Sequence, residues 1–134
     1  MIEKIDHIGI VVKDLSKAIE VYSEGLGLEV RSTEEIAEYN VKIAFLAIGE
    51  ALIELIEPTG PGTSQDFLNE HGEGINHICY RVTDLRESLG ELSKKLRVRD
   101  KEPRLGAAGS IVAFLDAESM FNVETELVER KREV

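Results

Sequence analysis

The sequence has little from which to build disulfides or membrane spans. Cys79 is the only cysteine, which excludes an intramolecular disulfide and indicates a thiol that is simply buried. Tryptophan is absent, and no apolar run is long enough to span a bilayer. The first residues already follow a strand-like pattern, which leaves no room for a signal peptide. We therefore expect a cytoplasmic protein with no membrane partner.

Positive charge is also scarce. The 134 residues include 16 Lys and Arg against 26 Asp and Glu, for a net charge of −10. Nucleic acid needs a basic footprint, so it is excluded as a partner. One segment is locally basic, with Lys94, Lys95, Arg97, Arg99, Lys101 and Arg104. Two interpretations of this segment stay open: a solvated helix end with an edge strand, or a contact for ligand phosphates.

A repeat of about seventy residues organises the chain. Ile5-Asp6-His7-Ile8-Gly9-Ile10-Val11-Val12 recurs as Ile75-Asn76-His77-Ile78-Cys79-Tyr80-Arg81-Val82, and 77 − 7 = 70. Residues 44–46 recur as 113–115, and residues 54–57 recur as 126–129. A repeat of this kind indicates a duplicated structural unit.

Hydrophobic patterning predicts the same order of elements, βαβββ, in each copy. Asp14 and Asp84 each follow the first strand and are predicted helix N-caps. The first copy has predicted strands at 5–12, 28–32, 42–46 and 51–56. The second copy has them at 76–83, 97–102, 111–115 and 123–128. A flexible loop is predicted at 103–109, between the second and third strands of that copy.

The predicted fold class is therefore α+β: two tandem βαβββ modules that form a curved mixed sheet around a central metal site. The modules cover about 4–58 and about 75–130, and a linker with a short helix joins them at 59–74. The whole chain, 1–134, is expected to be one domain.

The repeat duplicates a histidine on the first strand and a glutamate on the last. A single strand histidine is more often a core or surface residue, and a single strand glutamate often faces solvent. The four residues His7, Glu54, His77 and Glu126 together are different, because a pseudo-symmetric pair of modules would bring them to one place. Two imidazoles and two carboxylates suit a divalent first-row metal. His71 has no counterpart and is expected at the surface.

A metal with open positions would polarise a carbonyl group and stabilise an enolate. The two carboxylates would move a proton on and off the carbon beside that carbonyl group. Carboxylates on opposite sides of the substrate would serve both faces of one carbon, which suits isomerisation or epimerisation.

With these residues the chain resembles the vicinal oxygen chelate (glyoxalase/bleomycin resistance) superfamily. Within it the resemblance is greatest to the methylmalonyl-CoA epimerase family and covers nearly the whole chain. The most specific segments are Gly72-Glu73-Gly74-Ile75-Asn76-His77 and Glu102-Pro103-Arg104-Leu105-Gly106-Ala107.

The resemblance implies a divalent metal, with cobalt favoured over manganese, nickel, zinc or iron, held by His7, Glu54, His77 and Glu126. It implies an acyl-CoA substrate whose 2R and 2S forms interconvert through an enolate, with Glu126 as the first catalytic base. Arg104 is expected to bind substrate, and a homodimer is usual for the family. The alternatives are a lactoylglutathione lyase of the glyoxalase I type and a non-enzymatic small-molecule-binding protein of the same fold.

The sequence departs from the family pattern at two places. Some bacterial epimerases have their second proposed base where Ile43 stands, so Glu54 is the substitute here. Many relatives have a His-Pro-Lys start and a Gly-Gly turn where this chain has residues 116–122, and the change is expected to reshape the acyl pocket.

Overall fold

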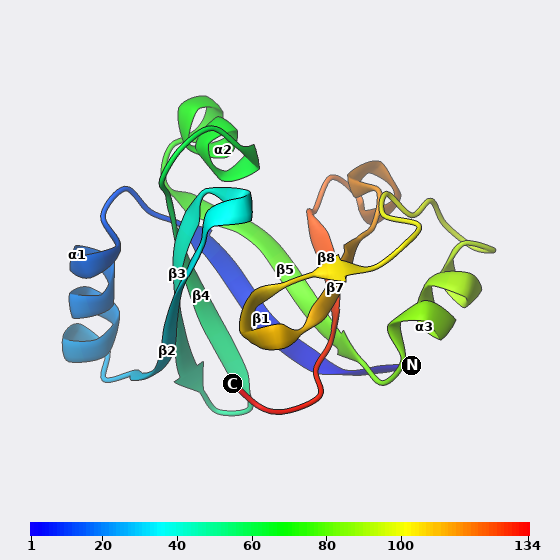
Figure 1. Ribbon diagram of the computed structural model, residues 1–134, viewed down its shortest axis with the longest axis horizontal. Helices are drawn as coiled ribbons and strands as arrows, with labels where there is room; N and C mark the ends of the chain where they lie inside the picture. Colours follow the sequence, from blue (N-terminus) through cyan, green and yellow to red (C-terminus); the bar gives the residue numbers. More distant parts are fainter. The chain divides into compact units, whose positions relative to one another are not determined.

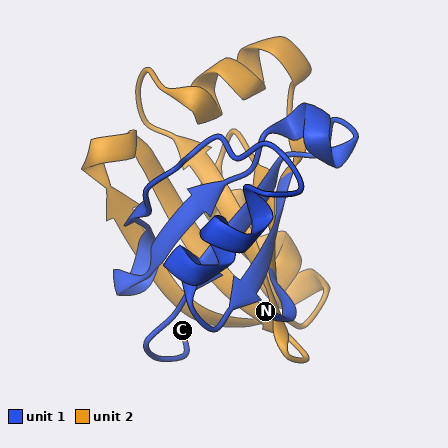
Figure 2. Ribbon diagram, turned by 90° about the vertical axis from the view of Figure 1, so that its right-hand side faces the viewer, with its two compact units in different colours: residues 1–6, 77–133 blue, residues 7–76, 134 orange.

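The computed structural model describes residues 1–134 and divides them into two compact units (Figure 2). Unit 1 consists of Met1–Asp6 and His77–Glu133, and unit 2 consists of His7–Asn76 with Val134. The units follow the sequence repeat except at the start of the chain. There the first strand, β1 (Ile2–Val11), contributes its first residues to unit 1 and the rest to unit 2.

Unit 2 contains the first βαβββ set, in the strand order β2-β3-β4-β1 (Figure 1). β1 runs parallel to β4, and the β2–β3 and β3–β4 pairs are antiparallel. After β1 come α1 (Leu15–Glu20), a π-helical turn (Val21–Gly25), β2 (Glu29–Ile36), a 3-10 turn (Ala37–Tyr39), β3 (Val41–Ile48), β4 (Ala51–Pro58) and the linker helix α2 (Thr63–His71).

Unit 1 contains the second set, in the order β1-β5-β8-β7-β6. β5 runs parallel to β8, and β7 is antiparallel to both β8 and β6. The elements are β5 (Gly74–Val82), α3 (Leu85–Leu92), β6 (Arg104–Leu105), two 3-10 turns (Ala107–Gly109 and Ala117–Met120), β7 (Ile111–Phe114) and β8 (Thr125–Glu129). The α+β class, the mixed strand pairing and the repeated βαβββ order are confirmed.

Matching side chains begin the helices α1 and α3. The Asp14 carboxylate accepts a hydrogen bond from the Lys17 amide at 3.1 Å, and the Asp84 carboxylate accepts one from the Glu87 amide at 3.0 Å. Both predicted N-caps are therefore confirmed, each satisfying an amide that the helix itself leaves without an acceptor.

A second pair of glutamates supports the same helix starts. Glu57 on β4 accepts from the Leu15 amide, and Glu129 on β8 accepts from the Leu85 amide, each at 2.8 Å. The sequence comparison detects these glutamates as part of the repeat but does not predict that they cap helices. They fix each helix to the last strand of its own module.

Strand alternation gives each unit one helix-covered face and one opposite face. In unit 2, Ala44, Leu46 and Leu55 pack with Leu15 of α1. In unit 1, Ala113, Leu115 and Leu127 pack with Leu85 and Leu89 of α3. Because successive side chains on a strand point to opposite faces, the residues next to these lie on the other face. We call that other face of each unit its site face.

The predicted strand at 97–102 is wrong. Residues 97–102 form no strand, and only Val98 makes an isolated bridge, to Leu115. Arg, Asp and Lys surround Val98, so the segment has too little apolar surface to hold a strand against the sheet. The ladder forms later, where Arg104 pairs with Val112 and Leu105 with Ile111. The predicted flexible loop at 103–109 therefore contains β6 and a 3-10 turn.

Two predictions about single residues are confirmed. The Cys79 thiol is buried, and His71 lies exposed at the end of α2. The helices of the chain are too short or too polar to cross a membrane.

Candidate functional site

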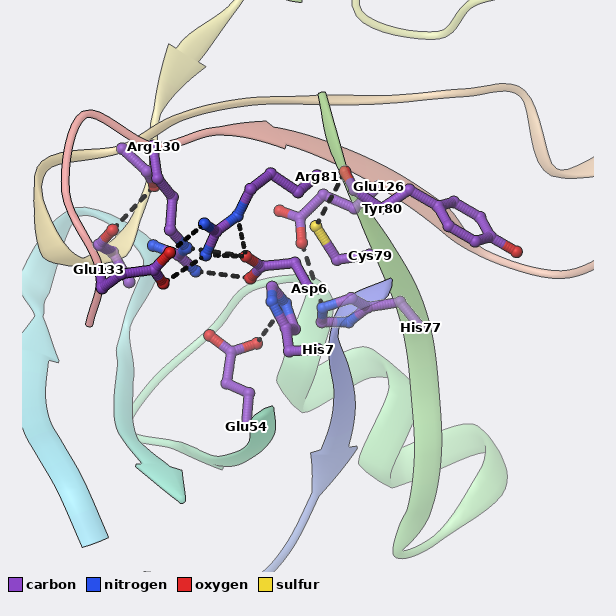
Figure 3. A network of polar contacts seen from close by, with 12 residues as sticks. Asp6, His7, Glu54, His77, Cys79, Tyr80, Arg81, Glu126, Arg130 and Glu133 are labelled. Atoms are coloured by element: carbon purple, nitrogen blue, oxygen red, sulfur yellow. Dashed lines mark hydrogen bonds and ion pairs between the residues drawn. The ribbon is translucent and has the colours of Figure 1, made fainter. Parts of the chain in front are cut away.

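The site face of unit 2 carries the first predicted histidine–glutamate pair. The Nε2 atom of His7 lies 3.4 Å from Oε1 of Glu54, and both residues are buried (Figure 3). Phe45 packs edge-on against the His7 ring, with ring centroids 5.6 Å apart. Phe45 and Glu54 are register partners on β3 and β4, so the aromatic ring orients one member of the pair and borders the other.

The site face of unit 1 carries the second pair in the same arrangement. The Nε2 atom of His77 lies 3.2 Å from Oε1 of Glu126, and again both residues are buried. Phe114 packs edge-on against the His77 ring at 6.0 Å, and it is the register partner of Glu126. The repeat seen in the sequence therefore extends to side-chain geometry.

Strand register explains why each glutamate meets its histidine. Glu54 lies opposite Gly9, two residues after His7, and Glu126 lies opposite Cys79, two residues after His77. Residues two apart share a strand face, so the histidine and glutamate project to the same side on neighbouring parallel strands.

The donor atoms of both pairs fit a metal site. A buried carboxylate needs a partner, and in each pair an imidazole nitrogen and a carboxylate oxygen face one another. Imidazole nitrogen and carboxylate oxygen are ligands for divalent first-row metals. The candidate ligand residues include His7, His77 and Glu126.

Ile43 lies on the site face of unit 2, where it is buried with 2% of its surface exposed. It precedes Phe45 by two residues on β3 and therefore points to the same side as the His7–Glu54 pair. An alkyl side chain transfers no protons, so this position supplies only an apolar surface.

Unit 1 has two cations beside the aromatic ring of its site face. The guanidinium carbons of Arg99 and Arg104 lie 5.0 and 5.5 Å from the centroid of the Phe114 ring. This places Arg104, the predicted substrate-binding residue, against the same ring that contacts His77. Arg104 also pairs with Asp100, and Arg99 pairs with Glu124.

Three cations of the basic segment, Arg97, Arg99 and Lys101, border a groove of about 860 Å³ along α3. Arg97 bridges Asp116 and Glu118 at 3.0 Å, which is the behaviour of a solvated surface residue. Leu89, Leu96 and Val98 line the same groove, so the segment combines surface ion pairs with an apolar floor.

The segment that departs from the family pattern has an unusual backbone. Phe121 and Asn122 both have positive φ, at 57° and 66°, and Phe121 is 93% exposed. Glycine fits this conformation without strain, whereas phenylalanine does not. The turn leads directly into β8, which carries Glu126.

Sequence reasoning missed a charged network in unit 1 around Asp6. Arg130 donates from Nε and Nη2 to the Asp6 carboxylate at 3.0 and 2.8 Å, and Arg81 donates from Nε at 3.0 Å (Figure 3). Arg81 also binds the Glu133 carboxylate at the end of the chain through two bonds. The sequence signals were the charged residues Asp6 and Arg81, which lie among the apolar residues of the strands β1 and β5.

The same network shifts two ionisation equilibria. The hydrogen bond from Arg81 is the main reason why the pKa of Glu133 lies below its ordinary value, and the bond to Glu133 in turn raises the pKa of Arg81 above its ordinary value. Both groups are therefore charged at neutral pH.

Comparison with known proteins assigns the family. The family model described as the Glyoxalase/Bleomycin resistance protein/Dioxygenase superfamily matches residues 6–114. The chain belongs to this superfamily. His7, Glu54 and His77 lie within the matched region, whereas Glu126 lies beyond it.

Individual proteins of known sequence or structure are similar to the chain along most of its length. The chain is 36% identical to uncharacterized protein YqjC of Bacillus subtilis (strain 168), covering 96% of this chain and 93% of that protein. It is 35% identical to the ethylmalonyl-CoA/methylmalonyl-CoA epimerase of Cereibacter sphaeroides, covering 86% and 89%. A solved methylmalonyl-CoA epimerase in complex with methylmalonyl-CoA and NH4+ is 34% identical, with a TM-score of 0.92 and coverage of 98% and 96%.

Proposed function

We propose that the protein is an epimerase that interconverts (2R)- and (2S)-methylmalonyl-CoA. The observation that carries the proposal is the duplicated, buried histidine–glutamate pair, in a chain similar along almost its whole length to epimerases of this substrate. The acidic hydrogen of such a substrate lies on the carbon between a thioester carbonyl and a carboxylate. Epimerisation needs that proton to leave and return on the opposite face.

We propose that His7, Glu54, His77 and Glu126 together hold one divalent metal, with cobalt first among the candidates. The support is the chemical match of the two pairs, in each of which a buried imidazole nitrogen and a carboxylate oxygen face one another. When bound, the metal would supply Lewis-acid stabilisation for negative charge on a carbonyl oxygen.

The protein's own groups would handle the proton. Glu126 is the first proposed base, because it lies on the site face of unit 1 near the start of β8, shortly after the segment 116–122. Glu54 is the second proposed carboxylate, since Ile43 transfers no proton. Removal of the proton gives an enolate, and its return from the other side gives the opposite configuration.

Arg104 is proposed to bind the anionic part of the substrate. Its guanidinium lies over Phe114, on the same side as the His77–Glu126 pair, and about half of its side chain is exposed. A guanidinium in this position suits a carboxylate or a phosphate, both of which an acyl-CoA substrate carries. We also propose a cytoplasmic homodimer, on the family resemblance alone.

The direct test follows the substrate's hydrogen at carbon 2 by NMR in deuterated water. Purified protein is expected to exchange that hydrogen in methylmalonyl-CoA, to lose the exchange after chelation, and to regain it with Co²⁺. A parallel assay uses the hemithioacetal of methylglyoxal and glutathione. Conversion of that adduct without exchange in methylmalonyl-CoA would establish a lactoylglutathione lyase instead, and activity in neither assay would favour a binding protein.

A further inference from the structure

Epimerisation by two proton carriers places two demands on them. Together they must reach both faces of the reacting carbon, and the pair needs a route for protons to and from water between turnovers. Glu54 and Glu126 are both buried, with their carboxylates 3.4 Å from His7 and 3.2 Å from His77, so neither supplies a carboxyl group that is open to solvent. A further carboxylate on the site face of unit 2 would meet these demands if it were exposed.

Strand register places Glu34 on this face. Glu34 on β2 is the antiparallel partner of Ile43 on β3, and cross-strand partners share a face with their Cβ atoms about 5 Å apart. Ile43 is in turn on the same face as Phe45, which contacts the His7 ring. The neighbouring residue Glu35 pairs with Lys42 and points to the opposite face.

The repeat gives independent support from unit 1. Its equivalent of Ile43 is Val112, two residues before Phe114, and the register partner of Val112 is Arg104. Glu34 and Arg104 are thus equivalent positions, and 104 − 34 = 70, the same offset as between the two histidines. The Arg104 side chain extends along the site face to the Phe114 ring. A side chain at position 34 therefore starts from a backbone position that directs it along the site face.

The surroundings of Glu34 suit a proton carrier. It lies on β2, the edge strand of unit 2, and it is exposed, so its carboxyl group can exchange protons with water. Its cross-strand neighbour Ile43 is buried and apolar. The carboxylate thus borders an apolar surface on one side and solvent on the other.

We infer that Glu34 is the second catalytic residue, and this inference rests on the proposed epimerase function. In one direction the Glu34 carboxylate takes the proton from carbon 2 to leave an enolate, and the protonated Glu126 carboxyl group returns a proton to the opposite face. The reaction ends with Glu34 protonated and Glu126 ionised, which is the starting state for the reverse direction. The unit 1 equivalent, Arg104, orients the substrate anion.

The test compares Glu34→Gln with Glu35→Gln, a matched control one residue away on the opposite face. Each variant receives the pure 2R and the pure 2S substrate separately in deuterated water. For Glu34→Gln we expect interconversion to fall at least about 100-fold, while hydrogen exchange persists with only one of the two isomers. Glu35→Gln should behave like the wild type with both isomers, and thermal unfolding should show that both variants fold.

The outcomes separate the two proposals. Wild-type protein that exchanges neither isomer would overturn the epimerase function, and this inference with it. Wild-type protein that exchanges both, alongside a Glu34→Gln variant that interconverts them at the wild-type rate, would overturn the role of Glu34 alone. Loss of exchange with both isomers in folded Glu34→Gln would also overturn it, because one proton carrier serves one face.

Discussion

The Nε2 atom of His77 lies 3.2 Å from Oε1 of Glu126, and the residues come from parallel strands that the register holds side by side. Neither residue is a neighbour of the other in sequence, since 49 positions separate them (126 − 77 = 49). The pair exists because two separate strands of unit 1 meet, and its equivalent in unit 2 forms for the same reason.

The first prediction concerns the two site histidines. His7→Ala and His77→Ala should each weaken Co²⁺ binding by about 100-fold or more, because each removes a proposed ligand and the imidazole beside a buried carboxylate. Titration calorimetry with the apo protein measures this. His71→Ala is the control, since His71 is exposed on α2, and it should bind like the wild type. Wild-type affinity in either site variant would show that the pairs do not share a metal.

Glu126→Gln separates metal binding from proton transfer. The amide oxygen still offers a ligand atom, but the side chain no longer accepts or donates the catalytic proton. Turnover should fall at least about 100-fold, with at most a partial loss of bound metal. Metal content and epimerisation rate are measured on the same sample. A fully active variant would remove Glu126 from the mechanism.

Glu54→Gln is expected to differ from Glu126→Gln. If Glu34 is the second proton carrier, Glu54 acts only as a ligand, and an amide oxygen can replace its carboxylate there. Turnover should then change by less than about 10-fold, compared with about 100-fold for the loss of an acid–base group. A drop as large as that of Glu126→Gln, with the metal retained, would return the second proton transfer to Glu54.

In the Asp6 network, the loss of a buried carboxylate should lower the free energy of unfolding more than the loss of an exposed carboxylate. Asp6→Asn removes the buried carboxylate charge that Arg81 and Arg130 share, and it should lower the free energy of unfolding by about 3 kcal/mol. Glu133→Gln removes a carboxylate whose side chain is 69% exposed, so its effect at pH 7 should stay below about 1 kcal/mol. Urea unfolding of both variants provides the comparison.

The pKa of Glu133 also fixes how that small effect depends on pH. Because this pKa is lower in the folded protein than in the unfolded chain, the stabilisation is complete above the ordinary carboxylate pKa. It is lost as the pH falls through the folded-state value. The difference in the free energy of unfolding between the wild type and Glu133→Gln should therefore shrink as the pH falls through that value, and a difference that grows in acid would contradict the ion pair with Arg81.

The backbone at Phe121 predicts a stabilising substitution. Phe121 has φ 57° and is 93% exposed, so it is strained and contributes almost no packing. Phe121→Asn should raise the free energy of unfolding by about 1 kcal/mol, since asparagine tolerates the left-handed conformation. Asn122→Ala, at φ 66°, should have the opposite sign. A destabilised Phe121→Asn would mean that the phenyl ring makes contacts that the exposed fraction does not reveal.

Much of the fold was predictable because the repeat and the alternation of apolar residues report the same order of elements. The four proposed ligands were found for that reason, because each histidine and each glutamate recurs at the matching position of the other module. The structure of the segment around Val98 was not predictable in this way, since a single apolar residue among charges resembles an edge strand in sequence. Glu34 was also missed, because its role depends on which residue lies opposite Ile43, and register is a property of the paired strands.

The division of β1 has a consequence for how the chain can be cut or expressed in parts. Residues 2–6 complete the strand order of unit 1, while residues 7–11 pair with β4 in unit 2. A fragment that starts after the linker would lack both the strand beside β5 and the Asp6 carboxylate that Arg81 and Arg130 bind. The two halves of the gene product are therefore expected to fold only when they are present together. A circular permutant that opens the linker at Pro61 and joins the original termini would keep β1 continuous, so it should remain foldable.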